Sequence, residues 1–103
     1  MNSTLIKPIL LGLDDEFSDE VYLLFYEPNG KYVAYYTNGV HGIACFNYED
    51  KAQYFSEYLG TEGLKIQSMS FDEARDLAKS KNQQITALIL LDDINNPKIH
   101  YVK

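Results

Sequence analysis

Two adjacent carboxylates, Asp92 and Asp93, follow directly on an almost unbroken apolar run at residues 85–91. A run of this kind is typical of a strand buried on both faces, and open α/β sheets gather ligands and metals where a parallel strand meets its loop. An apolar strand that ends in acids also resembles the strand whose acid holds magnesium in phosphate-loop nucleotidases. The partner motif of those enzymes, G-x-x-x-x-G-K-S/T, is however absent from the sequence. Two interpretations of the pair are therefore open: a small-molecule or metal-dependent site, or turn-forming residues ahead of Asn95 and Asn96.

Cys45 and His41 are the residue types of a nucleophile and its base. Residues four apart in one strand point to the same face but lie about 13 Å apart at ~3.3 Å per residue, beyond hydrogen-bond reach. A catalytic Cys45 would need His100 instead, and a lone cysteine in an apolar segment is usually a small buried hydrophobe. The sequence also lacks the C-x-x-C and H-x-x-x-H spacings of a zinc site and the spaced acids of a calcium loop. We therefore expect no enzyme activity and no cofactor.

The charge balance narrows the classes of partner. The formal net charge is −6 and the pI is about 4.7, whereas binding to nucleic acid or to an anionic membrane rests on clustered Lys and Arg. No apolar run approaches the ~18 residues needed to cross a membrane. A single cysteine cannot form an internal disulfide, which favours a reducing, cytoplasmic setting. We therefore expect neither a nucleic-acid partner nor a membrane partner.

Residues 1–19 divide into an apolar arm and an acidic connector. Pro8 argues against a helix through the arm, and the apolar stretch is too short for a convincing signal peptide. Three alternatives are open: an edge strand, an arm packed on its own core, or a segment docked on another chain. The arm residues predicted to bind a partner are Leu5, Ile6, Ile9 and Leu10.

Three stretches rich in Tyr, Val, Phe and Ile follow the connector, at residues 20–27, 31–37 and 40–46. They are separated by Asn29-Gly30 and Asn38-Gly39. The Asn-Gly dipeptide is the strongest short-range signal for a hairpin with a type I′ turn, because it tolerates positive φ at both central positions. The sequence therefore predicts a three-strand meander.

Two amphipathic helices follow the meander. Asn47 is placed to cap the first helix, and Ser70 with Glu73 forms the S-x-x-E capping box of the second. The short turn before the last strand forces antiparallel pairing, so the chain ends in a hairpin. The predicted elements after the meander are a helix over 48–59, a strand over 64–69, a helix that opens at 70, the central strand at 85–91 and a strand over 98–102.

These elements predict an α+β (mixed α/β) fold with the order βββαβαββ. Residues 20–103 form one domain whose mixed sheet joins the N-terminal meander to the C-terminal hairpin, with two crossover helices. A chain of 103 residues has the length of one domain, and no internal repeat or linker marks a second.

Tyrosine is the residue least explained by folding alone, with nine in 103 residues and no tryptophan. Alternate residues of a strand share a face, so the meander can place several of these rings on one surface. Tyrosine is enriched at protein interfaces because its ring buries area at low entropic cost while its hydroxyl stays paired or wet. The surface either binds a partner or is covered by the arm. Its predicted members are Tyr22, Tyr26, Tyr32 and Tyr36.

A strand containing Leu-Phe, at residues 21–26, is followed by the apolar stretch 42–46 and by a helix start of the form F-x-x-E-D-x-A at residues 46–52. In these features residues 21–59 resemble a family of small uncharacterised α+β domains found in cyanobacteria and chloroplasts. The resemblance implies an α+β fold and offers no catalytic residues.

The leading hypothesis from the sequence is a non-enzymatic protein-binding or adaptor module that uses the tyrosine-rich sheet face and the arm. One alternative is a small-molecule or metal-dependent site at Asp92 and Asp93, at the end of the central strand. A structural homo-oligomer held by exchange of the arm is the other, so we expect a protein partner or self-association.

Overall fold

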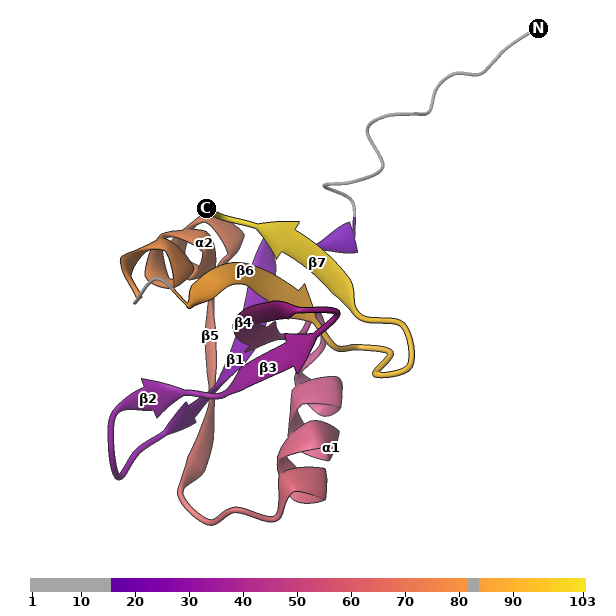
Figure 1. The fold of residues 1–103 in the computed structure, drawn as a ribbon. Helices are drawn as coiled ribbons and strands as arrows, with labels where there is room; N and C mark the ends of the chain where they lie inside the picture. Colours follow the sequence, from indigo (N-terminus) through magenta and orange to yellow (C-terminus); the bar gives the residue numbers. More distant parts are fainter. Residues whose placement is uncertain (1–15, 82–83) are drawn as a thin grey trace, which may run out of the picture.

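Two helices and seven strands make up the part of the chain that this computed structural model describes, residues 16–81 and 84–103. The predicted α+β class and the single domain are confirmed (Figure 1). The strands are β1 (Glu20–Tyr26), β2 (Lys31–Tyr32), β3 (Ala34–Thr37), β4 (Val40–Cys45), β5 (Leu64–Ser70), β6 (Ile85–Leu90) and β7 (Lys98–Tyr101), and the helices are α1 (Glu49–Leu59) and α2 (Phe71–Ser80). The arm residues Leu5, Ile6, Ile9 and Leu10 lie outside the described residues.

The strands form two sheets, where the sequence predicted one mixed sheet. Their orders are β2-β1-β5 and β3-β4-β6-β7, and β4 runs parallel to β6. The predicted strand 31–37 divides at Val33. The Val33 amide donates to the Leu24 carbonyl at 2.9 Å, and the Val33 carbonyl accepts from the Ala44 amide at 3.0 Å. The prediction of one sheet is therefore wrong because the chain leaves β1 for β4 at this residue, so β2 and β3 belong to different sheets.

The two Asn-Gly pairs form different turns. Asn38 and Gly39 both have positive φ, 51° and 78°, which confirms the predicted backbone of a type I′ turn. At the other pair only Gly30 has positive φ, while the Asn29 side chain accepts the Lys31 amide at 3.0 Å. The register of β1 against β2 leaves residues 27–30 as the loop, which is too long for a type I′ turn. The hairpin is present, but the turn type predicted for it is wrong.

The central strand β6 is buried on both faces, as predicted. From residue 87 on, alternate side chains enter two different buried clusters. Ile85 packs on the same side as Leu88, although period-two alternation placed it with Ala87, because the register against β4 shifts between His41 and Gly42. A Cβ on Gly42 would lie 2.7 Å from the carbonyl oxygen of Ala87, so the close approach of β4 and β6 requires glycine here.

Each helix covers one of the two buried clusters. Strand β1 contributes to both, which leaves neither of its faces uncovered. Figure 1 shows α2 beside β6 at one end of the molecule and α1 at the other end. The α2 cluster consists of Phe17, Val21, Leu23, Ile43, Cys45, Ala74, Ala78, Leu88 and Leu90. The α1 cluster consists of Leu24, Ala44, Phe46, Ala52, Phe55, Ala87, Ile89 and Leu91.

The start of α2 is fixed by the predicted capping box, which is confirmed. The Ser70 hydroxyl accepts from the Glu73 amide at 3.0 Å, and the Glu73 carboxylate accepts from the Ser70 amide at 2.9 Å. Helices α1 and α2 have 11 and 10 residues. Within the described part of the chain, neither they nor any other helix has the length and apolarity to cross a bilayer.

Candidate functional site

Asp92, just beyond the end of β6, lies against the start of α1. Its two carboxylate oxygens lie 3.0 and 3.3 Å from the Asn47 amide nitrogen, which donates to them. The Asn47 side chain accepts from the Ser18 amide at 2.8 Å and donates to the Glu16 carbonyl at 2.7 Å. Asn47 therefore ties together the start of the described chain, the entry to α1 and the end of β6.

The prediction that Asn47 caps α1 is consequently wrong. Tyr48 occupies the N-cap position with extended backbone angles, and no side chain caps the helix. The physical reason is that the polar atoms of the Asn47 side chain already bond residues that lie far away in the sequence. A local sequence pattern cannot predict that long-range hydrogen bonds replace the capping hydrogen bond.

The half-buried position of Asp92 alters its acidity. Burial raises the pKa of this carboxyl, and the charge of Asp50 raises it further. The amides of Asn47 and Tyr48 and the charge of Lys51 favour the ionised form and oppose this rise in pKa. The net effect is a pKa above the ordinary value, so Asp92 is a carboxyl held between a helix start and an apolar wall.

Asp93 makes the hydrogen bonds of a turn residue. Its carboxylate accepts from the Asn95 amide at 3.1 Å, and its carbonyl accepts from the Asn96 amide at 2.9 Å. In residues 16–81 and 84–103 no three His, Cys, Asp or Glu side chains are grouped so that they could hold a metal ion. The two acids are neighbours in sequence but serve different local structures.

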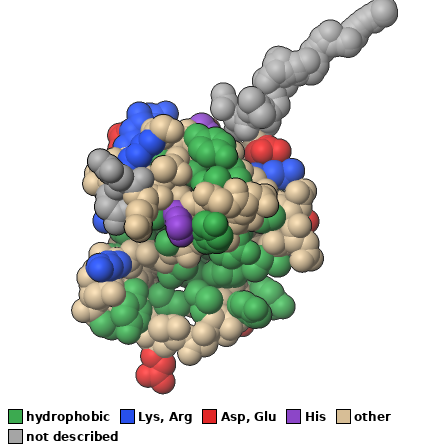
Figure 2. All heavy atoms as spheres, viewed as in Figure 1, with side chains coloured by type: hydrophobic (Ala, Val, Ile, Leu, Met, Phe, Trp, Pro, Cys, Tyr) green, Lys and Arg blue, Asp and Glu red, His purple; other side chains and the backbone are tan. Residues whose placement is uncertain are grey.

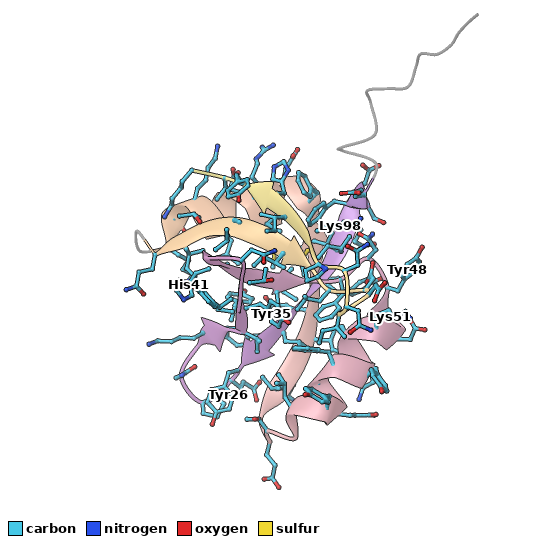
Figure 3. All side chains as sticks on the ribbon, turned by 45° about the vertical axis from the view of Figure 1, so that its right-hand side comes forward. Tyr26, Tyr35, His41, Tyr48, Lys51 and Lys98 are labelled. Atoms are coloured by element: carbon cyan, nitrogen blue, oxygen red, sulfur yellow. The ribbon has the colours of Figure 1, made fainter. Side chains whose placement is uncertain are left out.

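A groove of 590 Å³ runs between α1 and the loop after β6. Its floor is apolar, and its rim carries three acids and one base. Figure 3 shows Lys51 and Tyr48 at the first turn of α1, beside that loop. We call this feature the α1 groove. It is lined by Asp50, Lys51, Tyr54, Phe55, Tyr58, Leu91, Asp92, Asp93 and Ile94.

Two tyrosines dominate the open side of the α1 groove. Tyr54 is 73% exposed and Tyr58 is 74% exposed, and the Tyr58 ring centroid lies 6.1 Å from that of Phe55 in the floor. Because they are four residues apart, they lie one helical turn from each other on the same side of α1. Figure 2 shows that hydrophobic side chains, tyrosine included, gather over the half of the molecule that contains α1.

The four tyrosines predicted on the strands do not share one surface. Tyr22 packs against the α1 cluster, whereas Tyr32 packs against the α2 cluster and donates its hydroxyl proton to Gln67. Tyr36 is exposed and its ring lies against His41, with centroids 4.4 Å apart. Figure 3 places Tyr26 at the hairpin end of β1, far from Tyr48. The pattern fails here because β1 is covered on both faces and β2 and β3 belong to different sheets.

The sequence did contain a signal for the tyrosines of the α1 groove. Tyr54 and Tyr58 have helical spacing within the predicted helix 48–59, outside its stripe of Ala52 and Phe55. An aromatic pair on the outer side of an amphipathic helix is an exposed apolar surface, and such surfaces mark interaction sites more often than singly scattered residues do.

Cys45 lies in the α2 cluster and is fully buried. Burial, followed by the nearby charge of Asp92, raises the pKa of this thiol to about 12, against the opposing effect of a hydrogen bond from the Phe46 amide. His41 is exposed, and the His100 ring packs against Phe17 and Phe71, with centroids 5.8 and 5.0 Å away. At neutral pH Cys45 is therefore a protonated core residue, without the thiolate that a nucleophile needs.

No model of a known protein family matches the chain, and no curated protein matches it at a significant level. The resemblance of residues 21–59 to small cyanobacterial and chloroplast domains stays a prediction from the sequence.

Proposed function

We propose that this protein is a non-enzymatic protein-binding module whose recognition surface is the α1 groove. The supporting observation is the exposed pair Tyr54 and Tyr58 beside an apolar floor in a domain whose other aromatic rings mostly pack inward. Such a pair offers a large contact area at low entropic cost, with hydroxyls that can bond a partner. The sequence hypothesis of a tyrosine-based binding surface is kept, but the surface is transferred from the strands to α1.

A second candidate function is the binding of a small molecule in the same groove. Its volume of 590 Å³ lies within the range of ligand pockets, and apolar walls with a few polar groups are typical of them. Against this candidate, Asp92 already accepts from Asn47, and Asp93 already accepts from Asn95. Because both carboxylates accept hydrogen bonds from the backbone, they are less available to a ligand, which favours the protein-binding function.

The test compares two matched double variants in affinity purification from the source organism. Tyr54→Ser with Tyr58→Ser removes both rings from the groove, and Tyr36→Ser with Tyr101→Ser removes two exposed rings elsewhere. Serine and tyrosine have similar helix propensities, so α1 should persist in the first variant. We expect wild type and the second variant to retain a partner that the first variant loses. The purified partner should then bind the purified wild-type protein directly. A partner lost equally from both variants would contradict the proposal.

The small-molecule candidate has its own measurement. Calorimetry with divalent cations and common nucleotides compares wild type with the double variant Asp92→Asn, Asp93→Asn. We expect the two proteins to give the same result. Micromolar binding that is lost in this double variant would favour the small-molecule function over the protein-binding function.

A further inference from the structure

This chain has an exposed apolar surface and a separate apolar stretch of sequence. The first is the outer side of the α1 groove. Of the seven large hydrophobic side chains that are exposed in the described residues, five lie on α1, at its N-cap or in the loop after β6: Tyr48, Tyr54, Tyr58, Leu59 and Ile94. The second is the arm, whose residues 5–13 include six large aliphatic side chains. Contact with water costs free energy for both, so contact with each other would stabilise both.

The arm joins the described domain at the end of the α1 groove. The Glu16 carbonyl is held by the Asn47 side chain, and the Glu16 carboxylate pairs with Lys98 at 3.5 Å. Asn47 immediately precedes Tyr48, the N-cap of α1, and its amide donates to Asp92 in the wall of the groove. The anchor of the arm is thus fixed beside the first turn of α1.

The arm is long enough to span the whole length of α1. Only Asp14 and Asp15 separate Leu13 from the anchor at Glu16, a tether of about 10 Å. Residues 5–13 in extended form would cover about 30 Å, and α1 with its 11 residues is about 16 Å long. Pro8 argues against a helix through the middle of the arm. A tether this short gives the arm an effective concentration of the order of millimolar at its own groove.

The charge of Lys7 complements the C-terminal end of α1. Lys7 is the only charged side chain in residues 1–13, and Asp14 and Asp15 are next to the anchor. These acids stay near the N-terminal end of α1, where the helix dipole attracts them and the acids of the first turn repel them, so they do not set the direction of the arm. An arm that runs antiparallel to α1 places Lys7 about 20 Å further on, near the C-terminal end, where the last turn contains Glu57 and no basic residue.

We propose that residues 5–13 occupy the α1 groove of the same molecule, antiparallel to α1, and that a protein partner must displace them to bind. The occupancy follows from the groove, the anchor and the charge of Lys7. The displacement by a partner rests on the proposed function. The arm thereby acts as a built-in competitor, because the apparent affinity of the groove for a partner equals its intrinsic affinity multiplied by the fraction of time that the groove is empty.

Disulfide trapping in the full chain tests the occupancy without a partner. Leu10 is placed close to Tyr58 in the antiparallel arrangement, so Leu10→Cys is combined with Tyr58→Cys. The matched control combines Leu10→Cys with Asp76→Cys, whose position is similarly exposed but on α2. Buried Cys45, with its pKa raised to about 12, stays unreactive and need not be replaced. We expect the groove pair to cross-link within one molecule at least ~10-fold faster than the control pair.

Each outcome of the trapping experiment decides something. Fast formation of a monomer with an internal disulfide supports the proposal. Fast formation of a covalent dimer would show that the arm enters the groove of a second copy, and equal rates for the two pairs would show that it does not enter the groove; either result overturns the proposal. The proposed function is judged separately, because loss of partner binding in Tyr54→Ser with Tyr58→Ser does not depend on where the arm lies.

NMR amide resonances test the occupancy of the groove without introduced cysteines. Leu10→Asp in the full chain should release the arm, so the amide resonances of residues 50–58 and 91–94 should shift while those of α2 stay in place. Asn2→Asp is the matched control, since it adds the same charge outside the apolar run. Identical spectra for Leu10→Asp and Asn2→Asp would overturn the occupancy.

Discussion

Helices α1 and α2 have nearly the same length and cover opposite clusters, but their ends and outer faces differ. α2 begins with a complete capping box, has Lys79 in its last turn and buries Ala74 and Ala78. α1 has no side-chain cap and no basic residue in its last turn, and it exposes Tyr54 and Tyr58. α2 therefore has a side-chain cap and a basic last turn that α1 lacks, whereas both helices have acids in the first turn and α1 alone ends at a glycine, Gly60, in the left-handed conformation.

The difference is the one expected if α2 serves stability and α1 is the binding helix of the proposed function. A helix needed only to cover a core gains from caps, favourable end charges and a polar outer face. α1 lacks a side-chain cap and a basic last turn, and it has large aromatic side chains on its outer face, for which another demand on those positions is the simplest physical explanation. The predictions that follow test this contrast, starting with the largest expected effect.

Leu88→Ala should destabilise the fold by ~3 kcal/mol, because Leu88 is fully buried in the α2 cluster and the change leaves a cavity. Tyr58→Ser on the outer side of α1 should change the free energy of unfolding by less than ~0.5 kcal/mol. Urea denaturation of both variants is the measurement. Losses of similar size would mean that the tyrosines of α1 are structural after all, and the contrast between the helices would fail.

Asn47→Ala should cost ~2 kcal/mol, since it removes the hydrogen bonds to Glu16 and Ser18 that hold the start of the described chain. Asn96→Ala is the matched control, because the backbone of Asn96, and not its side chain, bonds Asp93. Denaturation midpoints should drop for the first variant and stay nearly constant for the second. Equal midpoints would show that the Asn47 side chain does not anchor the chain in solution.

Substitutions at the two N-caps should change the free energy of unfolding in opposite directions. Ser70→Ala breaks the capping box of α2 and should destabilise by ~1 kcal/mol, whereas Tyr48→Ser supplies the missing cap of α1 and should stabilise by up to ~1 kcal/mol. Thermal melting of the two variants checks the signs. If Tyr48→Ser lowers the melting temperature, the tyrosine makes a structural contribution that its exposed position does not reveal.

The smallest expected effect concerns Asp92 and pH. Its pKa in the folded state is raised, so folding favours the protonated carboxyl; this contribution is present below the unfolded pKa and is lost as pH rises through the folded pKa. The stability of wild type relative to Asp92→Asn should therefore decrease as pH rises through the acidic range. Urea midpoints of the two proteins across that range provide the measurement. A difference that increases with pH would mean that the hydrogen bonds from Asn47 outweigh burial.

Features that depend on neighbouring residues could be predicted from the sequence. The capping box at Ser70, the turn at Asn38-Gly39 and the two buried faces of β6 are of this kind, because each is set by local backbone chemistry or by the period of a strand.

Features that depend on contacts between distant residues could not be predicted. Val33 divides two strands because its amide and carbonyl bond different elements, and Asn47 bonds residues about thirty positions earlier in place of its helix. For the candidate site, the sequence singled out Asp92 and Asp93, which line the groove, and predicted a tyrosine surface on the strands. It could not place the groove, because which tyrosines stay exposed depends on how two sheets and two helices pack.

The parallel pairing of β4 with β6 has a consequence for the order of assembly during synthesis. All of α1, β5 and α2 lies between these strands in the sequence, so β4 leaves the ribosome long before its neighbour exists. Until β6 arrives, Ile43 and Cys45 have no Leu88 or Leu90 to pack against. The nascent chain therefore carries an open strand edge and an unfilled apolar face until β6 has been translated, a period in which chaperones would bind it most readily.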